Sequence, residues 1–370
     1  MKKVIPEGMR DYTFDECKSR REILNLVCDG FLKWGYKEIS TPTIEFYETF
    51  NDSTESLKEE DMYKFFDNNG KILVLRPDMT VPVARMISTK LKDLELPARL
   101  FYNANTFRVN ESMIGRRNEY IDCGIELIGA KEGYSDLEVL IIAMETLKAM
   151  GKKEFKLEIG NVQILKMAME DMNLDSTKRE VLAELIDKKS LTTLNNFLTA
   201  LNLSKEHFDF LARLPWLFGD YSAIDEALGL AFNEKIKESI LYLKNIYEVL
   251  TELGYGNYIT FDLSIVPKLN YYTGIIFNGY IEGVANRVLR GGRYDNLARN
   301  FGSDLAAVGF SVDINSIVDY LKKDYLEEDK KEILKEVVIN SENFIEGFKE
   351  VIALGKSGQT VKINYKEWFI

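Results

Sequence analysis

The sequence predicts an α+β fold, an antiparallel sheet flanked by helices, with a helical insertion and a short C-terminal α/β tail. Three observations predict it. Residues 99–129 form two β-strand-like runs joined by a polar loop. Residues from about 161 to 255 are almost wholly helical in pattern, and the β-pattern returns at residue 258. We therefore expect a core over residues 1–322 and a tail over residues 323–370.

The N-terminal region predicts a helix followed by a strand. From Phe14 to Trp34, apolar residues recur at helical spacing, and Gly35 ends the run. Residues 36–46 then predict one strand that is interrupted by Pro42. Because proline has no N–H to donate to a neighbouring strand, Pro42 marks a sheet edge or a bulge.

A hairpin and a second helix are predicted next. Residues 65–74 alternate around Asn69-Gly70, which is a typical hairpin turn. Directly after it, Asp78 and Thr80 are residue types that favour a helix N-terminus, so residues 81–91 are predicted to be helical. Helix capping by itself explains both polar residues.

The stretch from Arg99 to Gly129 organises the chain. Its second predicted strand, residues 120–128, places Asp122 and Glu126 among apolar neighbours. The two acids face the same side of a strand by the period of two, and an acid is costly to bury unless it is paired. We therefore expect both to face a wet or ligand-filled cavity, with Arg108 beside them. The alternative is that the charges lie on a solvated face of the sheet.

The remaining elements follow from periodicity. Residues 134–150 predict an amphipathic helix and residues 155–159 a strand. The helical stretch 161–255 contains no motif that carries chemistry. Beyond Asp324, a charged linker-like run precedes a strand, a helix and a strand, which is too little chain to close an independent core easily.

Composition excludes several classes of function. No apolar run approaches the ~20 residues that span a bilayer, and the N-terminus lacks the apolar core of a signal peptide, so we expect a cytoplasmic protein. The net charge of −11 opposes a large nucleic-acid footprint. Three scattered cysteines and a single histidine, His207, argue against a zinc site and a Ser-His-Asp mechanism. We expect no cofactor and no metal.

Segments spread from residue 6 to about residue 320 resemble, in register, the motifs of the class II aminoacyl-tRNA synthetases, closest to the histidyl-tRNA synthetase branch. The stretch around Arg108 resembles their motif 2, and residues 291–295 match their glycine-rich loop. Pro42 matches the proline of motif 1, which lies at the dimer interface in those enzymes. The resemblance therefore implies a class II synthetase-like fold and a homodimeric core.

The resemblance also implies a pocket for histidine. Asp78 and Thr80 match the segment that holds the amino group, although Asp stands where the family has Glu. Tyr271 and Tyr272 match the pair that closes over the imidazole. We assign a guanidinium to the carboxylate, acids to the ammonium and the imidazole N–H, and Glu126 to the imidazole. The expected histidine-binding residues are Asp78, Thr80, Arg108, Asp122, Glu126, Tyr271 and Tyr272.

The chain departs from the synthetases where the triphosphate is bound. Ser316 and Pro267 stand at positions of family arginines, and Asn110 stands at the position of a motif 2 glutamate. A neighbour such as Lys268 or Arg290 repairs one such loss, but repairing three is difficult. Where the synthetases have a complete anticodon-binding domain, we expect residues beyond Asp324 to form at most its opening fragment or an unrelated small tail. Adenylate formation needs cations around the phosphates, so the resemblance points to a binding or regulatory protein.

One family has that profile: the chain resembles the regulatory subunits of ATP phosphoribosyltransferase, the synthetase paralogues of histidine biosynthesis. The resemblance implies a non-catalytic chain in a hetero-octamer with a short catalytic subunit, activation of that partner and feedback inhibition by histidine. It leaves open whether histidine binds the synthetase-like pocket or the subunit interface. A divergent histidyl-tRNA synthetase or other class II tRNA ligase is the alternative, and a free-standing amino-acid-binding module is a third.

Overall fold

The computed structural model describes residues 4–51, 59–109, 117–150, 154–266, 271–325, 335–340 and 342–366. The chain divides into two compact units, Met1–Tyr320 and Leu321–Ile370. Within the described ranges, no helix is long and apolar enough to cross a membrane.

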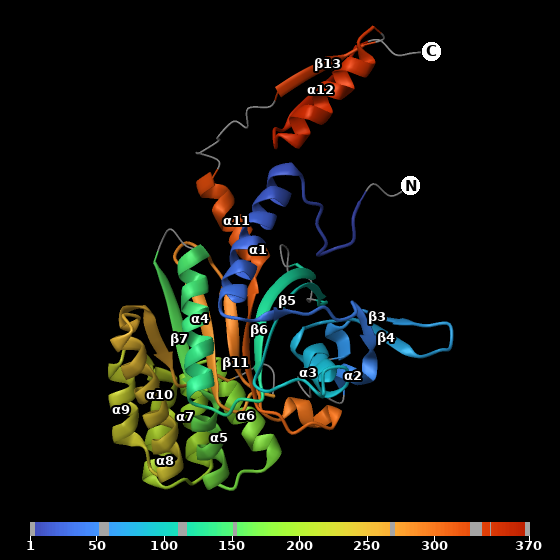
Figure 1. The fold of residues 1–370 in the computed structure, drawn as a ribbon. Helices are drawn as coiled ribbons and strands as arrows, with labels where there is room; N and C mark the ends of the chain where they lie inside the picture. The colour runs from blue at the N-terminus through green and yellow to red at the C-terminus, as the bar shows by residue number, and fades with distance from the viewer. Residues whose placement is uncertain are drawn as a thin grey trace. The chain divides into compact units, whose positions relative to one another are not determined.

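A nine-stranded sheet forms the core of the first unit (Figure 1). Its six central strands, from β5 to β7, pair antiparallel, whereas β1 pairs with β5 and β9 pairs with β7 in parallel. The predicted antiparallel sheet is confirmed, with parallel pairs added towards both edges. In spatial order the strands are β1 (Lys37–Glu38), β5 (Ala98–Phe107), β6 (Glu119–Ile128), β12 (Ala307–Asp313), β11 (Leu289–Arg293), β10 (Ile275–Ile281), β7 (Phe155–Asn161), β9 (Ile259–Asp262) and β8 (Phe218–Gly219).

Two long helices cover one face of this sheet (Figure 1). They are α1 (Phe14–Lys33) and α4 (Tyr134–Met150), close to the bounds that periodicity predicts. Fully buried Phe31 of α1 packs with ring centroids 6.0 Å from Phe101 and 5.8 Å from Phe310. The odd-numbered residues of β6 therefore face the helices, and Asp122 and Glu126 face the opposite side of the sheet.

A small three-stranded sheet contains the predicted hairpin, which is confirmed. In it, β3 (Lys64–Phe66) pairs antiparallel with β4 (Ile72–Leu75), and β4 pairs with β2 (Ile44–Phe46). The prediction of one strand through Pro42 is wrong, because β1 and β2 belong to different sheets and Pro42 lies in the loop between them. Proline cannot extend a hydrogen-bonded ladder, and the chain changes sheets there.

Helices α2 (Tyr47–Asn51) and α3 (Thr80–Ser88) flank this small sheet. Helix α3 ends at Ser88, three residues before the predicted end at Leu91. Shorter elements of the first unit are the 3₁₀ turns η1 (Glu59–Asp61), η2 (Leu214–Trp216), η3 (Gly256–Tyr258) and η4 (Leu297–Phe301).

The helical insertion is confirmed. Asp175 Oδ1 accepts a hydrogen bond from the Lys178 N–H, and Ser204 Oγ accepts one from the His207 N–H, so these two side chains cap the starts of helices. Its helices are α5 (Val162–Asp171), α6 (Ser176–Asp187), α7 (Leu191–Ala200), α8 (Lys205–Arg213), α9 (Ser222–Leu230) and α10 (Glu234–Glu252).

The C-terminal unit has the predicted strand, helix and strand. Strands β13 (Lys335–Ile339) and β14 (Val361–Tyr365) pair in parallel, and α12 (Phe344–Lys356) connects them. Its small core consists of buried Val337, Ile339 and Leu354. Helix α11 (Ile314–Tyr325) precedes this part of the chain.

Candidate functional site

Strand register builds the floor of a cleft on the sheet face opposite α1 and α4. Glu126 of β6 lies opposite Gly309 of β12, and Gly309 lies opposite Gly292 of β11. A Cβ at Gly309 would lie 1.9 Å from Glu126 Oε2, and a Cβ at Gly292 would lie 2.6 Å from the Tyr272 ring. Two adjacent strands therefore need glycine so that a carboxyl and an aromatic ring can lie against the backbone.

The next two sets of paired residues along these strands include charged side chains. Ser311 of β12 lies opposite Arg290 of β11, and Asp313 of β12 lies opposite Asp122 of β6. Asp122 and Glu126 share a face, as predicted, but they are four residues apart, which is about 13 Å along a strand. The two acids therefore lie at different places in the cleft.

The first of two adjoining hollows is named here the tyrosine pocket. It has a volume of about 20 Å³, sufficient for a single water. The Tyr271 ring centroid lies 4.8 Å from that of Tyr272 and 5.7 Å from that of Tyr294, so tyrosine rings crowd the space. The residues that line it are Asp78, Met79, Thr80, Tyr102, Asp122, Glu126, Tyr271, Tyr272, Arg290, Tyr294, Phe310 and Ser311, together with Gly291, Gly292 and Gly309.

Glu126 is the buried acid of the tyrosine pocket. Its side chain is 2% exposed, and it accepts hydrogen bonds from the hydroxyl of Tyr294 and the side chain of Thr80. Burial raises the pKa of Glu126 to about 8, although both hydrogen bonds lower it. The carboxyl is therefore mostly protonated at neutral pH in the empty pocket, and a cationic ligand would favour its ionised form.

Asp78 has one satisfied and one unsatisfied carboxyl oxygen. Its Oδ1 accepts a 3.0 Å hydrogen bond from the Val81 N–H and so caps α3, while buried Oδ2 has no hydrogen-bond partner in the described part of the chain. Burial raises the pKa of Asp78, and the charge of Arg108 opposes that rise. An unpaired buried acceptor is costly, so Oδ2 is suited to receive a donor from a ligand.

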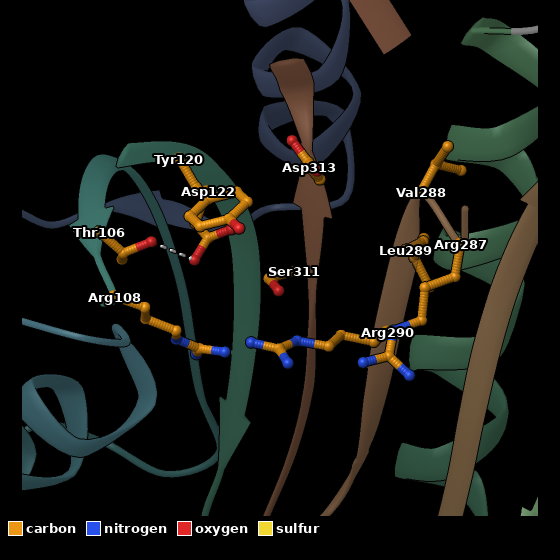
Figure 2. A pocket seen from close by; sticks show the side chains of 10 residues that line it. All are labelled: Thr106, Arg108, Tyr120, Asp122, Arg287, Val288, Leu289, Arg290, Ser311 and Asp313. Atoms are coloured by element: carbon orange, nitrogen blue, oxygen red, sulfur yellow. Dashed lines mark hydrogen bonds between the residues drawn. The ribbon is translucent and has the colours of Figure 1, made fainter. Parts of the chain in front are cut away.

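The second hollow, named here the arginine cavity, has a volume of about 200 Å³. Figure 2 shows guanidinium groups from the two sides of this cavity, with Asp122 and Asp313 further along it. Asp122, Arg290 and Ser311 line both hollows, so the two adjoin. The residues that line the arginine cavity are Thr106, Arg108, Tyr120, Asp122, Arg287, Val288, Leu289, Arg290, Ser311 and Asp313.

Six of the seven residues predicted for histidine line the tyrosine pocket. The exception is Arg108, which lines the arginine cavity and donates from Nε to the carbonyl of Pro77 at 2.7 Å. The sequence analysis missed Tyr294, although it lies within the matched segment 291–295. It also missed Arg287, for which no motif gave a signal.

Of the positions where the sequence departs from the synthetases, the structure describes Ser316. Ser316 Oγ donates a 2.6 Å hydrogen bond to Asp313, and this pair caps α11, so no cation lies at that position. Asn110, Pro267 and Lys268 lie outside the described residues. Among the residues that the structure does describe, no three His, Cys, Asp or Glu side chains are grouped so that they could hold a metal ion.

A buried ion pair supports the strand end that carries Tyr294. Arg293 and Asp136 of α4 are 1% and 0% exposed, and Arg293 Nη2 lies 2.6 Å from Asp136 Oδ1. Arg293 Nη1 also donates to Asp295 at 2.8 Å. Paired charges on both sides of Tyr294 therefore fix its backbone, which positions its hydroxyl against Glu126.

Comparison with known proteins places these features in a family. The model of the histidyl-tRNA synthetase family matches residues 8–317. An ATP phosphoribosyltransferase regulatory subunit from Clostridium kluyveri is 38% identical over 366 residues, which cover 98% of this chain and 94% of the relative. A protein of the same name from Bacillus cereus is 40% identical over 367 residues, covering 98% of this chain and 86% of the relative.

Solved structures agree. A crystal structure described as an ATP phosphoribosyltransferase regulatory subunit/histidyl-tRNA synthetase from Bacillus halodurans has a TM-score of 0.88 and 32% identity, covering 99% of this chain and 93% of that one. A histidyl-tRNA synthetase from a Nostoc species has a TM-score of 0.78 at 20% identity, covering 100% and 88%, which shows the fold alone. The predicted class II synthetase-like fold is thus confirmed, and the chain belongs to the family of ATP phosphoribosyltransferase regulatory subunits.

Proposed function

We propose that this chain is the non-catalytic regulatory subunit of a cytoplasmic ATP phosphoribosyltransferase, the enzyme of the first step of L-histidine biosynthesis. It binds the short catalytic subunit, is required for its activity and mediates its inhibition by histidine. The complex is a hetero-octamer that contains homodimers of this chain. The observation that carries the proposal is that relatives named as regulatory subunits match nearly the whole chain, and that its cleft gathers side chains suited to histidine.

Each group of the effector has a matching side chain in the cleft. The unpaired Oδ2 of Asp78 accepts from the ammonium, and Glu126 accepts from the imidazole N–H. The carboxylate lies where the two hollows meet and accepts from Arg108, whose buried Nη2 has no partner within the described ranges. Asp122 lies at the same boundary.

Binding requires a rearrangement, because the tyrosine pocket has only about 20 Å³ of free volume. Tyr271 and Tyr272 are half-buried, and their rings must move apart before an imidazole can enter between them and Glu126. The carboxyl must also ionise. With a pKa of about 8, ionising Glu126 at pH 7 costs about 1.4 kcal/mol, because one pKa unit corresponds to that free energy.

Reconstitution with the short catalytic subunit tests the proposal. We expect transferase activity to rise when this chain is added, and histidine to inhibit the complex but not the catalytic subunit alone. Co-purification and the mass of the complex measure the stoichiometry. A catalytic subunit that is fully active without this chain would contradict the required role, and a complex that ignores histidine would contradict the inhibitory one.

A histidyl-tRNA synthetase is the second candidate, and the arginine cavity is the observation that favours it, because it keeps positive charge beside the amino-acid pocket. We nevertheless expect neither histidine-dependent ATP–pyrophosphate exchange nor tRNA charging by the purified chain, since Ser316 and Pro267 replace two family arginines. The measurement is exchange of labelled pyrophosphate. Exchange well above background would sink the regulatory proposal.

The homodimer is tested without the partner. The proposed interface includes the segment around Pro42, and exposed apolar side chains such as Trp34, Ile44 and Phe46 lie near it in sequence. We expect sedimentation velocity at micromolar concentration to give the mass of two chains. A monomer under these conditions would rule the homodimeric core out.

A further inference from the structure

Two cysteines from distant parts of the chain lie in contact between α1 and the large sheet, on the face opposite the cleft. Cys28 belongs to α1 and Cys123 to β6, and they are 95 positions apart in the sequence. Their sulfur atoms lie 3.6 Å apart, and both thiols are free. A disulfide joins its sulfurs at about 2.05 Å, so small changes in the side-chain torsion angles and in the position of α1 bring these two within bonding distance.

The packing of α1 on the sheet holds the two thiols together. Cys123 is an odd-numbered residue of β6, so its side chain faces the helices, and it is fully buried. Cys28 borders the buried stripe of α1 and is half-buried. Fully buried Phe31, one turn further along α1, packs against two rings of the sheet and so fixes the helix at this place. A small solute therefore meets Cys28 before it meets Cys123.

The contact also makes the two thiols chemically different. The hydrogen bond between them lowers the pKa of Cys28, although burial and the charges of Glu38 and Asp29 oppose that fall. The same hydrogen bond and burial raise the pKa of Cys123. The thiolate is the nucleophile in cysteine chemistry. Cys28 is therefore suited to attack an oxidant first, and Cys123 keeps its proton until a second step.

We propose that Cys28 and Cys123 form a reversible disulfide when the chain meets hydrogen peroxide. The Cys28 thiolate attacks one oxygen of the peroxide and the O–O bond breaks, which gives Cys28 sulfenic acid and hydroxide. This hydroxide becomes water with the proton that Cys28 released. The reaction needs neither a metal nor the cleft, so it does not depend on the proposed function.

The second step completes the bond. The Cys123 sulfur attacks the Cys28 sulfur, and the S–S bond forms as the S–O bond breaks. The departing hydroxide takes the Cys123 proton and leaves as a second water. Two thiols are thus oxidised while one peroxide is reduced to two waters. Thiol exchange with glutathione or thioredoxin restores both thiols, so the bond is transient wherever these reductants are present.

The bond fastens α1 to the strand that carries Glu126 on its other face. The loop that it closes contains β1, the small three-stranded sheet, α3 and β5. Because a cross-link between residues so far apart restricts the unfolded chain, it stabilises the folded one. We therefore expect the oxidised chain to unfold at a higher urea concentration than the reduced chain.

Thiol counting, peptide mapping and urea unfolding of the full chain test the pair, before and after hydrogen peroxide and again after dithiothreitol. Cys28→Ala is the test variant. Cys17→Ala is the matched control, because Cys17 is an exposed cysteine of the same helix whose thiol donates to the carbonyl of Tyr12. Cys123→Ala keeps the attacking thiol and removes its partner, so dimedone, which reacts with sulfenic acids, should label Cys28 in that variant.

We expect peroxide to lower the free thiols of the parent from three to one per chain, with Cys28 and Cys123 in one cross-linked peptide, and dithiothreitol to restore all three. Cys17→Ala should form the same bond and show the same rise in the urea midpoint, and Cys28→Ala should show neither. Peroxide-treated parent without the cross-linked peptide would overturn the proposal, as would a disulfide that joins two chains through Cys17 instead. Dimedone labelling of Cys123 in Cys28→Ala as fast as that of Cys28 in Cys123→Ala would overturn the assigned order of attack. An oxidised parent with an unchanged urea midpoint would show that the bond does not fasten α1 to β6.

Discussion

The two hollows of the cleft differ in volume and in charge although they share a wall. The tyrosine pocket is almost filled by its own side chains and contains two buried carboxyls whose pKa values are raised. The arginine cavity has about ten times its volume, and three guanidinium groups line it, none of which forms a salt bridge with an acidic side chain among the described residues. One hollow is therefore suited to a cation and a ring, and the other to an anion.

This difference shows that a chain can lack the arginines of a family motif and still have positive charge in the same cleft. Ser316 stands where the resemblance to the synthetases places an arginine, and its hydroxyl donates to Asp313, with which it caps a helix. Positive charge nevertheless remains in the cleft, because Arg290 of β11 and Arg287, which precedes β11, line the same hollow as Arg108. A site must be judged from the assembled cleft, since different positions of one fold can supply the same chemistry.

The largest expected effect is that of Gly309→Ala, which should disturb the tyrosine pocket. Its Cβ would lie 1.9 Å from Glu126 Oε2 and 2.3 Å from the carbonyl of Ile125, so the backbone itself must shift. We expect histidine affinity, measured by calorimetry, to fall more than about a hundredfold, with a loss of about 1–3 kcal/mol in unfolding free energy from overpacking.

The control is Gly229→Ala, since no atom lies within 4 Å of a Cβ at that position of α9. Normal histidine binding by Gly309→Ala would mean that histidine does not lie on this floor.

Glu126→Gln tests the acceptor proposed for the imidazole. Glutamine keeps the shape but exchanges a charged acceptor for a neutral amide, which removes a bond worth about 1.5–3 kcal/mol. Histidine affinity should fall about ten- to hundredfold, and inhibition of the partnered transferase should weaken while its uninhibited activity stays. The control is Glu158→Gln, because Glu158 of β7 also has a pKa raised by burial but lines neither hollow. If Glu126→Gln responds to histidine like the parent, the effector binds elsewhere.

The raised pKa of Glu126 also predicts a pH dependence of stability. A carboxyl with a pKa of about 8 in the folded chain and 4.5 as its ordinary value is protonated only in the folded state between those limits. Its contribution to the free energy of unfolding is complete below about pH 4.5, falls by up to about 1.4 kcal/mol per pH unit as pH rises, and is absent above about pH 8.

Urea unfolding of the parent and Glu126→Gln across this range measures that contribution. Asp78, whose pKa is also raised, is present in both proteins, so its effect cancels. The parent should lose stability relative to the variant as pH rises. Saturating histidine should reduce the slope, because the bound ligand favours the ionised carboxylate. Parallel curves without ligand would show that Glu126 is ionised at neutral pH.

The sequence predicts which face of the sheet carries the site. It does not predict that the site is divided into a tyrosine pocket and an arginine cavity. Alternation along β6 places Asp122 and Glu126 on one side, because successive side chains of a strand point to opposite faces. The position of each acid in the cleft depends on two strand registers, that of β6 with β12 and that of β12 with β11. Both registers pair residues that are far apart in the sequence. Local periodicity contains no information about that pairing.

The same limit explains the other differences. The contact of Tyr294 with Glu126 joins residues 168 positions apart, and the arginine cavity is lined by Arg108 and by Arg287, which are also far apart in the sequence. The prediction at Pro42 failed for a related reason. The sequence predicts one strand interrupted by Pro42, and only the tertiary structure assigns the two halves to different sheets.

The smallest expected effect comes from Tyr294→Phe, which keeps the ring beside Tyr271 and removes only the hydroxyl that donates to Glu126. That hydrogen bond lowers the pKa of Glu126, so without it the pKa should rise further and less carboxylate should exist at neutral pH. Histidine affinity at pH 7 should fall about fivefold, corresponding to about 1 kcal/mol for one hydroxyl hydrogen bond.

Raising the pH distinguishes this loss from that of Glu126→Gln. The carboxyl of Tyr294→Phe can still ionise, so its deficit in histidine affinity should shrink between about pH 7 and pH 9, whereas glutamine has no proton to lose and its deficit should persist. Tyr255→Phe is the control, because its hydroxyl donates at 2.7 Å to the carboxylate of Glu145 in α4, outside both hollows. A Tyr294→Phe deficit that is the same at both pH values would mean that the hydroxyl contacts histidine directly. In that case the raised pKa of Glu126 would have no part in recognition, and the acid of the tyrosine pocket would act through its shape alone.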